Sequence, residues 1–274
     1  MRVSVCQMSC KADKAENTAT ALRLLGEAAA RGSEVAVLPE YFDYMGPEEG
    51  MMANSEELGG PLSSALAARA KELGIWVVGG TIRIRDGGER LSNTMIVYDP
   101  EGRRAAIYRK IHVFDVCIPG EVEFRESRMV RPGLDVVTTD IAGVPSGLTI
   151  CYDLRFPELF RLLALAGVKI LYMPSAFTTF TGRDHWELLL RARAVENQCF
   201  VVAPNQFGNA IPGIPLYGRS MIIDPWGTVL ACAPDGVGVI TADLDLSYLE
   251  GVRRKLPSLQ NRRTDIYNLA VNER

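Results

Sequence analysis

Cys151 has the sequence surroundings that a nucleophilic thiol needs. It follows the apolar run Gly147–Ile150, which predicts a strand, and precedes a turn that leads into the predicted helix Pro157–Ala166. A side chain at such a corner projects from the sheet toward backbone N–H groups and a helix N-terminus, which favour a thiolate. A buried structural role is the alternative. The remaining cysteines lack this context and are predicted to be structural: Cys6, Cys10, Cys117, Cys199 and Cys232.

A nucleophile needs a base, and Glu40 is one candidate. It comes directly after Pro39 and the apolar run Val35–Leu38, so we expect it at the end of a buried strand, where a desolvated carboxylate can serve as a general base. An exposed loop carboxylate is the alternative interpretation. A Cys–His pair that uses His112 or His185 also stays open, because spacing alone does not exclude it.

Lys110 follows a third predicted strand, Ala105–Arg109. A lysine at the end of a strand can stabilise an oxyanion, although most lysines are solvated surface groups. The chain has six cysteines without a CxxC pair and two histidines that lie far apart. We therefore expect no disulfide, no metal ion and no cofactor.

The composition is that of an ordinary globular protein. Of the 274 residues 47% are hydrophobic and 23% are charged, and the net charge is −3, which argues against a nucleic-acid partner. No apolar stretch approaches the length of a membrane-spanning helix. The N-terminus lacks the pattern of a secretory signal, so we expect a cytoplasmic location.

Short apolar runs alternate with helical windows along the whole chain, which predicts an α/β fold in a single domain over residues 1–274. The turn Asp224–Gly227 between two apolar runs predicts a hairpin. The predicted strands are Arg2–Met8, Glu34–Leu38, Ile75–Ile84, Thr94–Tyr98, Gly147–Ile150, Lys169–Met173, Phe200–Ala203 and Ser220–Ile223. The predicted helices are Lys14–Arg31, Pro61–Leu73, Pro157–Ala166, Asp184–Asn197 and Leu246–Lys255.

Taken together, the motifs around these residues resemble the Glu-Lys-Cys signature of the nitrilase superfamily of carbon–nitrogen hydrolases. They occur in the order of that family, and the similarity extends from the first strand to Tyr267. It is closest to the Nit-type amidases, which act on deaminated glutathione and on omega-amides. The motifs are Pro39–Glu40, Phe42–Gly46, Tyr108–His112, Phe114–Val116, Ile118–Gly120, Thr149–Glu158, Pro174–Phe177, Gly182–Glu187, Arg191–Asn197, Tyr217–Ser220 and Asp224–Gly227.

The resemblance implies a nitrilase-type αββα sandwich, with two mixed sheets flanked by helices, and a homodimer or higher homo-oligomer. The apolar helix Pro157–Ala166 fits an interface between two copies. The resemblance also implies that Glu40 is the base, Cys151 the nucleophile, and Lys110 with the Tyr152 N–H the oxyanion donors. Glu126 matches a further glutamate of the family, with a loop carboxylate as the alternative.

The same resemblance gives the substrate-binding residues. Arg155 matches an arginine that binds a substrate carboxylate, although a structural ion pair with Glu158 or Asp153 is the alternative. Phe177 and Thr181 match other positions of the pocket, and Tyr44 is expected near Glu40. Residues 205–216 are predicted to be a long loop that leaves the exact substrate open.

The predicted function is hydrolysis of a small carboxylate-bearing amide, the omega-amide of a 2-oxo acid or deaminated glutathione, to an acid and ammonia through a cysteine thioester. The alternatives are hydrolysis of an N-carbamoyl amino acid such as beta-ureidopropionate, and a non-catalytic interaction protein of the same fold. Only a small-molecule partner is expected, with no nucleic acid and no membrane.

Overall fold

The computed structural model of the chain describes residues 1–118, 122–211 and 214–272. Within these residues one mixed sheet has eight strands: β1 (Arg2–Gln7), β2 (Val35–Val37), β3 (Glu56–Glu57), β4 (Trp76–Val78), β5 (Ile82–Arg85), β6 (Ser92–Tyr98), β7 (Arg104–Arg109) and β18 (Gly238–Asp243). Their order is β18-β1-β2-β4-β6-β5-β3, and β7 pairs with β6.

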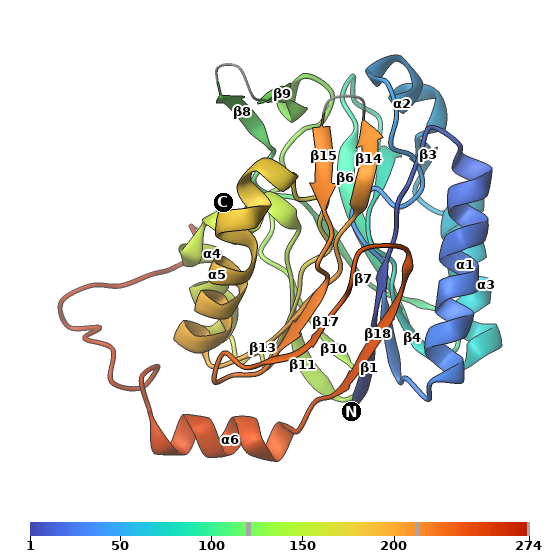
Figure 1. Cartoon of the computed structure of the whole chain (residues 1–274). Coiled ribbons are helices and arrows are strands. Elements are labelled where there is room, and N and C mark those ends of the chain that lie inside the picture. Colours follow the sequence, from blue (N-terminus) through green and yellow to red (C-terminus); the bar gives the residue numbers. More distant parts are fainter. Residues whose placement is uncertain (119–121, 212–213, 273–274) are drawn as a thin grey trace.

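A second mixed sheet is made of β10 (Thr138–Ile141), β11 (Val144–Leu148), β12 (Ile170–Tyr172), β13 (Phe200–Ala203), β16 (Met221–Ile223) and β17 (Val229–Cys232), in that order. The predicted hairpin at Asp224–Gly227 joins the antiparallel strands β16 and β17. Two further ribbons, β8 (Asp115–Ile118) with β9 (Val122–Arg125) and β14 (Phe207–Ile211) with β15 (Ile214–Tyr217), lie at one end of the sheets (Figure 1).

Helices cover the outer faces of both sheets. Helices α1 (Lys14–Ala30) and α3 (Pro61–Leu73) lie on the first sheet, and α4 (Pro157–Leu165) and α5 (Thr179–Asn197) lie on the second (Figure 1). The other helical segments are α2 (Glu48–Asn54), α6 (Leu246–Lys255) and two 3₁₀ turns, η1 (Glu126–Arg128) and η2 (Cys151–Arg155). The predicted αββα sandwich is therefore confirmed. No helix among the described residues has the length and apolar character needed to cross a membrane.

Alternation of side chains along the strands explains the layers. Val35 and Val37 of β2 point between the two sheets, where they join a core that includes Leu148 of the second sheet. Ala36 and Leu38, on the opposite face, belong to the core beneath α1 and α3. Both faces of the first sheet are buried, so its central strands are apolar runs rather than alternating ones.

Several predicted elements differ from the structure: the predicted strand Gly147–Ile150 is β11 over Val144–Leu148, and the predicted helix Asp184–Asn197 begins at Thr179 as α5. The predicted strand Ile75–Ile84 is two strands, β4 and β5, because Gly80 turns the chain with a φ of +54°. The predicted loop 205–216 contains β14 and β15, whose Gly and Pro content is typical of a loop. The motif Ile118–Gly120 lies mostly outside the described residues.

Candidate active site

Lys110 lies at the centre of a buried cluster of charges. It follows β7 directly, and its backbone N–H donates to the Asn93 carbonyl oxygen at 2.9 Å. Its side chain is 1% exposed, and Nζ donates to Glu40 Oε1 and to Glu126 Oε2, each at 2.9 Å. The structure thus brings together three of the four residues that were predicted to be catalytic.

Glu40 enters this cluster from the end of β2. The close approach of Gly80 to the Pro39 carbonyl oxygen, 2.2 Å from where a Cβ would stand, keeps any larger residue out of position 80. Beside its bond from Lys110, Glu40 Oε1 accepts from Asn93 Nδ2 at 2.8 Å, and Oε2 accepts from the Ala176 N–H at 2.9 Å. Donors from three separate segments therefore fix the carboxylate, which is what a positioned base requires.

Glu126 opens η1 and is also buried. Its Oε1 accepts from Tyr41 Oη and from Asn93 Nδ2, and its Oε2 accepts from the Phe114 N–H at 2.6 Å in addition to Lys110. Burial alone would raise the pKa of Glu126, but the Lys110 charge and the hydrogen bonds outweigh it and lower the pKa. The Glu126 carboxylate is therefore charged at neutral pH, and a role as an exposed loop carboxylate is excluded.

The pKa of Lys110 is shifted in the opposite direction to that of Glu126. Burial would lower the pKa of Lys110, but the carboxylates of Glu126 and Glu40 raise it well above its ordinary value. Lys110 is therefore a permanent cation inside the protein, and not a solvated surface lysine.

Cys151 lies at the corner that the sequence predicted, but the local geometry differs. Strand β11 ends at Leu148, and η2 rather than α4 begins at Cys151, whose φ of +44° is rare for a residue with a side chain. The Cys151 N–H donates to the Pro174 carbonyl oxygen at 3.0 Å, which holds this strained turn against the end of β12.

The predicted thiolate at Cys151 is wrong for the free protein. Burial raises the pKa of the thiol well above its ordinary value, the Glu40 carboxylate raises it further, and the Lys110 charge only partly opposes them. The resting group is therefore a neutral thiol that needs a base when it attacks. Glu40 is the carboxylate that lies beside it.

Asp153 and His112 support this turn from below. Asp153 Oδ2 accepts from the Ile150 N–H at 2.8 Å and from Tyr108 Oη at 2.7 Å, and Oδ1 accepts from the His112 N–H at 3.1 Å. The His112 ring lies 2.7 Å from Asp153 Oδ1 through Nδ1 and stacks on Phe156. His112 therefore orders the loop and does not face Cys151 in a Cys–His pair.

Two small cavities meet at Cys151. One, of about 20 Å³, is lined by Tyr152, Arg155, Phe177 and Thr181, as predicted for substrate-binding residues. The other, of about 50 Å³, is lined by the Glu40, Lys110 and Glu126 cluster together with Tyr41, Arg83 and Phe124.

Tyr44 lines neither cavity, so its predicted place in the pocket is wrong. Its hydroxyl reaches the Pro47 carbonyl oxygen, whereas Tyr41, three residues earlier, faces the site. Tyr41 has a φ of +51°, and its side chain reaches Glu126. The amino-acid sequence around Tyr41 does not predict this backbone conformation.

Arg155 has no ion pair with Glu158 or Asp153, or with any other carboxylate of the described part of the chain. Its guanidinium lies 5.9 Å from the centre of the Tyr152 ring and 5.2 Å from that of Phe177. Its Nη1 is 3.3 Å from Nδ1 of His185, the second histidine considered as a partner for the thiol. The guanidinium is therefore available to an anion in the first cavity.

Asn93 and Arg83 belong to the site although the sequence did not single them out. Arg83 of β5 is the register partner of Asn93 of β6, and the pairing of β6 with β7 places Lys110 on the other side of Asn93. Three neighbouring strands thus present Arg83, Asn93 and Lys110 in a row. The signal that could have found them is strand order, which the sequence alone does not give.

No group of three or more His, Cys, Asp or Glu side chains within the described ranges is arranged to hold a metal ion.

The chain is similar to known proteins over nearly its whole length. A family model described as carbon–nitrogen hydrolase matches residues 2–254. Human deaminated glutathione amidase is 43% identical over 272 residues, which cover 97% of this chain and 83% of that protein. Human omega-amidase NIT2 is 36% identical over 272 residues, which cover 99% and 98%.

Solved structures agree with these sequence relatives. The NitFhit protein of C. elegans superimposes with a TM-score of 0.92 at 37% identity and covers 99% of this chain and 67% of that one. Nit3 of Saccharomyces cerevisiae, described as a member of branch 10 of the nitrilase superfamily, gives a TM-score of 0.86 at 32% identity, with 96% of both chains covered.

Proposed function

The chain belongs to the carbon–nitrogen hydrolase family, as its sequence motifs predicted, and we propose that it hydrolyses the amide bond of a small amide that carries a carboxylate. The names of its relatives support this reaction, since they are called deaminated glutathione amidase and omega-amidase. The observation that carries the proposal is Lys110 Nζ, held at 2.9 Å from both Glu40 and Glu126 in the cavity that Cys151 lines.

The neutral thiol sets the first step. Glu40 takes the proton from Cys151 Sγ as the sulfur attacks the amide carbonyl carbon, and a tetrahedral oxyanion forms. Lys110 and the N–H of Tyr152 stabilise that oxyanion. Glu126 keeps Lys110 charged and fixed, because its carboxylate holds Nζ without competing for the reacting carbon.

The proton that Glu40 has taken is given to the leaving nitrogen, so the C–N bond breaks and the amine departs while a thioester remains on Cys151. Glu40, again ionised, takes a proton from water, and the hydroxide adds to the thioester carbonyl. Collapse of this second intermediate releases the acid and returns the proton to Sγ. The atoms and protons of this sequence balance with the amide and water as the two reactants.

Arg155 gives the specificity for an acid. A guanidinium between the Tyr152 and Phe177 rings, without a carboxylate of its own, can bind a substrate carboxylate through two parallel hydrogen bonds. Phe177 and Thr181 line the same cavity and contact the chain between that carboxylate and the amide.

The alternatives are tested by the products. The protein is incubated with an omega-amide of a 2-oxo acid, an N-carbamoyl amino acid and a neutral short amide, and ammonia and carbon dioxide are measured. We expect ammonia without carbon dioxide from the omega-amide. If only the carbamoyl compound reacts, and releases carbon dioxide and ammonia in equal amounts, the protein is a carbamoyl hydrolase. If no substrate gives a product, the non-catalytic alternative is favoured.

Two variants test the roles of the named residues. Cys151→Ala should abolish turnover and the thioester detected by mass spectrometry, while Cys232→Ala, which changes a cysteine outside the cavity, should not. Arg155→Ala should reduce kcat/KM for the acidic amide about 100-fold, with partial recovery in Arg155→Lys and a smaller effect on neutral amides. Equal losses for both substrate types would contradict carboxylate binding.

We also propose that two copies associate through α4. Its inner face packs into the core, but Leu165 is 38% exposed and Leu162 is half-buried. Leu165→Asp should give a monomer in sedimentation if this face is the interface. The cytoplasmic location and the single domain over residues 1–274 stay predictions.

A further inference from the structure

The guanidinium of Arg155 has a single hydrogen-bond partner in the described part of the chain. Its Nη1 lies 3.3 Å from Nδ1 of His185, and the described residues offer it no other hydrogen bond and no ion pair. The Tyr152 and Phe177 rings lie beside it and contribute only their faces. His185 is therefore the one polar side chain of the described residues that orients this guanidinium.

The chemistry of the two groups fixes the state of the imidazole. A guanidinium carries N–H donors and no acceptor, so Nδ1 of His185 must accept through its lone pair. The ring hydrogen is then on Nε2, and a ring that accepts at Nδ1 is uncharged. His185 therefore orients Arg155 without neutralising its charge.

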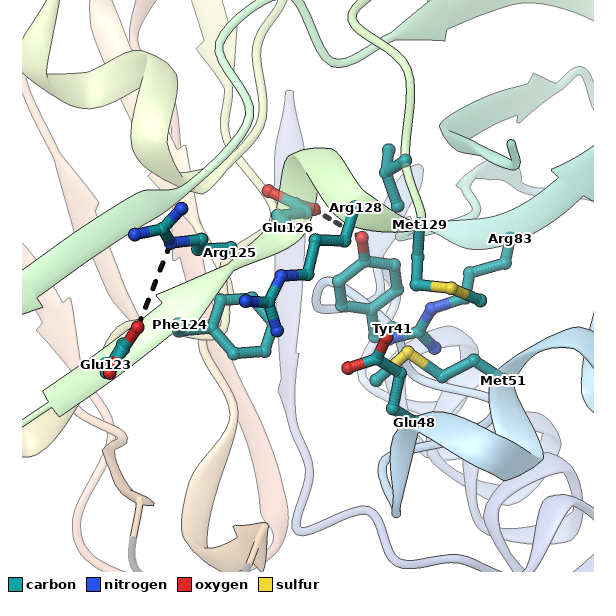
Figure 2. Close-up of a pocket in the computed structure, with 11 residues that line it drawn as sticks. Tyr41, Glu48, Met51, Arg83, Glu123, Phe124, Arg125, Glu126, Arg128 and Met129 are labelled. Carbon is teal, nitrogen blue, oxygen red and sulfur yellow. Dashed lines mark hydrogen bonds and ion pairs between the residues drawn. The ribbon is translucent and has the colours of Figure 1, made fainter. Parts of the chain in front are cut away.

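Arg125 shows the other way to hold an arginine. It lines a cavity of about 390 Å³ beside Glu126, and in Figure 2 it is joined to Glu123, with Nε 3.8 Å from Oε1. A carboxylate of the protein in this position competes with any carboxylate that approaches the guanidinium from outside. The uncharged acceptor at Arg155 avoids that competition.

Helix α5 places His185 in this position. Thr181 and His185 are four residues apart and therefore lie one turn apart on the same face of the helix. Thr181 lines the cavity that Arg155 also lines. The next residue, Trp186, is fully buried, and its Nε1 donates to the Arg219 carbonyl oxygen at 2.7 Å. This anchor fixes the helix beside His185.

The same helix also holds the backbone at Arg155. Arg193 of α5 is 5% exposed, and its Nε and Nη2 donate to the Leu154 carbonyl oxygen at 3.1 and 2.7 Å. That carbonyl belongs to the peptide bond directly before Arg155, in the turn η2 that begins at Cys151. Helix α5 thus fixes Arg155 at its backbone and at the tip of its side chain, so the guanidinium is oriented relative to Cys151 before a substrate binds.

We propose that His185 is a positioning residue that determines specificity. Its uncharged imidazole orients the Arg155 guanidinium and leaves the full positive charge to the carboxylate on the acyl part of the substrate. The inference rests on the proposed amidase function, in which Arg155 binds that carboxylate, and extends it to a residue that does not line the cavity. His185 should therefore matter for acidic amides and much less for neutral ones.

The test uses two amides that differ in one charge. Glutaramate has a carboxylate at the end of its acyl chain, and 5-methylhexanamide has an isopropyl group of similar shape in its place; ammonia release from each is measured. The wild-type protein should prefer glutaramate by about 100-fold in kcat/KM. The ratio within one preparation is independent of the fraction of folded enzyme, and damage to the fold or to Cys151 affects both substrates alike.

His185→Asn and His185→Asp have the same shape, and each places an oxygen near the position of Nδ1. The asparagine accepts without a charge, so it should keep the ratio within about threefold of the wild type. The aspartate neutralises Arg155 and repels the substrate carboxylate, so its ratio should fall close to one. His185→Leu removes the acceptor and should lower the ratio about tenfold.

Arg183→Gln is the matched control. It changes the net charge of α5 by the same amount as His185→Asp, but Arg183 is exposed and has no hydrogen bond or ion pair among the described residues, so the ratio should stay at the wild-type value. An asparagine variant as low as the aspartate variant, an unchanged ratio in all three His185 variants, or equal losses for both amides would overturn the role of His185 alone. A wild-type ratio near one would overturn carboxylate binding by Arg155 as well, and no turnover of either amide would overturn the proposed function.

Discussion

Lys110 and Arg83 are two buried cations that line the same cavity, yet their surroundings are opposite. Lys110 donates to two carboxylates of the protein, and those carboxylates are themselves bound by Asn93, Tyr41 and backbone N–H groups. Arg83 donates one hydrogen bond to the Tyr44 carbonyl oxygen and packs over the Tyr41 ring, and its Nε is buried without a hydrogen-bond partner. The difference lies in compensation: the fold supplies two carboxylates to the Lys110 charge, whereas no ion pair is formed by Arg83 in the described part of the chain.

The comparison predicts a large effect on stability at Lys110 and a small one at Arg83. Lys110→Met removes the cation between two buried carboxylates, so the free energy of unfolding should fall by about 3–5 kcal/mol and turnover should be lost. Arg83→Met removes a cation that lacks an ion pair, so its free energy of unfolding should stay within about 1 kcal/mol of the wild type. Urea denaturation of both variants measures this. Equal losses would show that Arg83 contributes to the stability of the fold as much as Lys110 does.

A second prediction concerns the carboxylate that fixes Lys110. Glu126→Gln removes a charge that raises the pKa of Lys110 and presents an NH₂ group to donors from Tyr41, Asn93 and Phe114. We expect kcat/KM to fall about 10²- to 10³-fold, the range for loss of one preorganised electrostatic group.

Glu123→Gln is its control, since Glu123 lies three residues earlier, is exposed and pairs only with Arg125. It should leave kcat/KM at the wild-type value. If both variants lose activity to the same extent, the ribbon β8–β9 rather than the Glu126 charge is responsible.

The sequence could predict those residues of the site that short local motifs mark. Lys110 follows β7 directly, and Glu40 and Cys151 lie three residues beyond the ends of β2 and β11, so short patterns locate all three residues, and sheet edges bring strand ends together. Asn93 and Arg83 lie within strands and gain their roles from the order β7, β6, β5, which no local pattern specifies. The thiolate prediction failed for a similar reason, because the burial that raises the pKa of Cys151 comes from elements distant in sequence.

The buried carboxyl of Asp43, near Arg83, makes the stability of the protein depend on pH. Burial raises its pKa to about 6, and its Oδ1 has no hydrogen-bond partner in the described structure. Because the folded protein holds this proton more tightly than the unfolded chain, the contribution of Asp43 is most favourable below about pH 4 and is lost as the pH rises to about 6.

Asp43→Asn removes this titration. The stability of the variant relative to the wild type should therefore increase between about pH 4 and pH 6 by up to about 3 kcal/mol, and stay constant above. Asp184→Asn, an exposed position on α5, should follow the wild-type curve. Parallel curves for Asp43→Asn and the wild type in urea denaturation would mean that a neighbouring group already neutralises Asp43.

The smallest expected effect is that of a change at Tyr41, which lies between the Lys110 cluster and Arg83. Its hydroxyl donates to Glu126 Oε1, and the Arg83 guanidinium packs over its ring. Tyr41→Phe keeps the ring and removes one of four hydrogen bonds to Glu126. Since that bond helps to lower the pKa of Glu126, its loss should raise this pKa, move the acid limb of the kcat/KM profile to higher pH and reduce the plateau about tenfold. Tyr44→Phe is the matched control, because the Tyr44 hydroxyl reaches only the Pro47 carbonyl oxygen at 3.4 Å, and its profile should coincide with the wild type. A Tyr41→Phe profile with a lower plateau but an unmoved acid limb would show that the hydroxyl only packs the site and that Glu126 is held by Lys110, Asn93 and Phe114 alone.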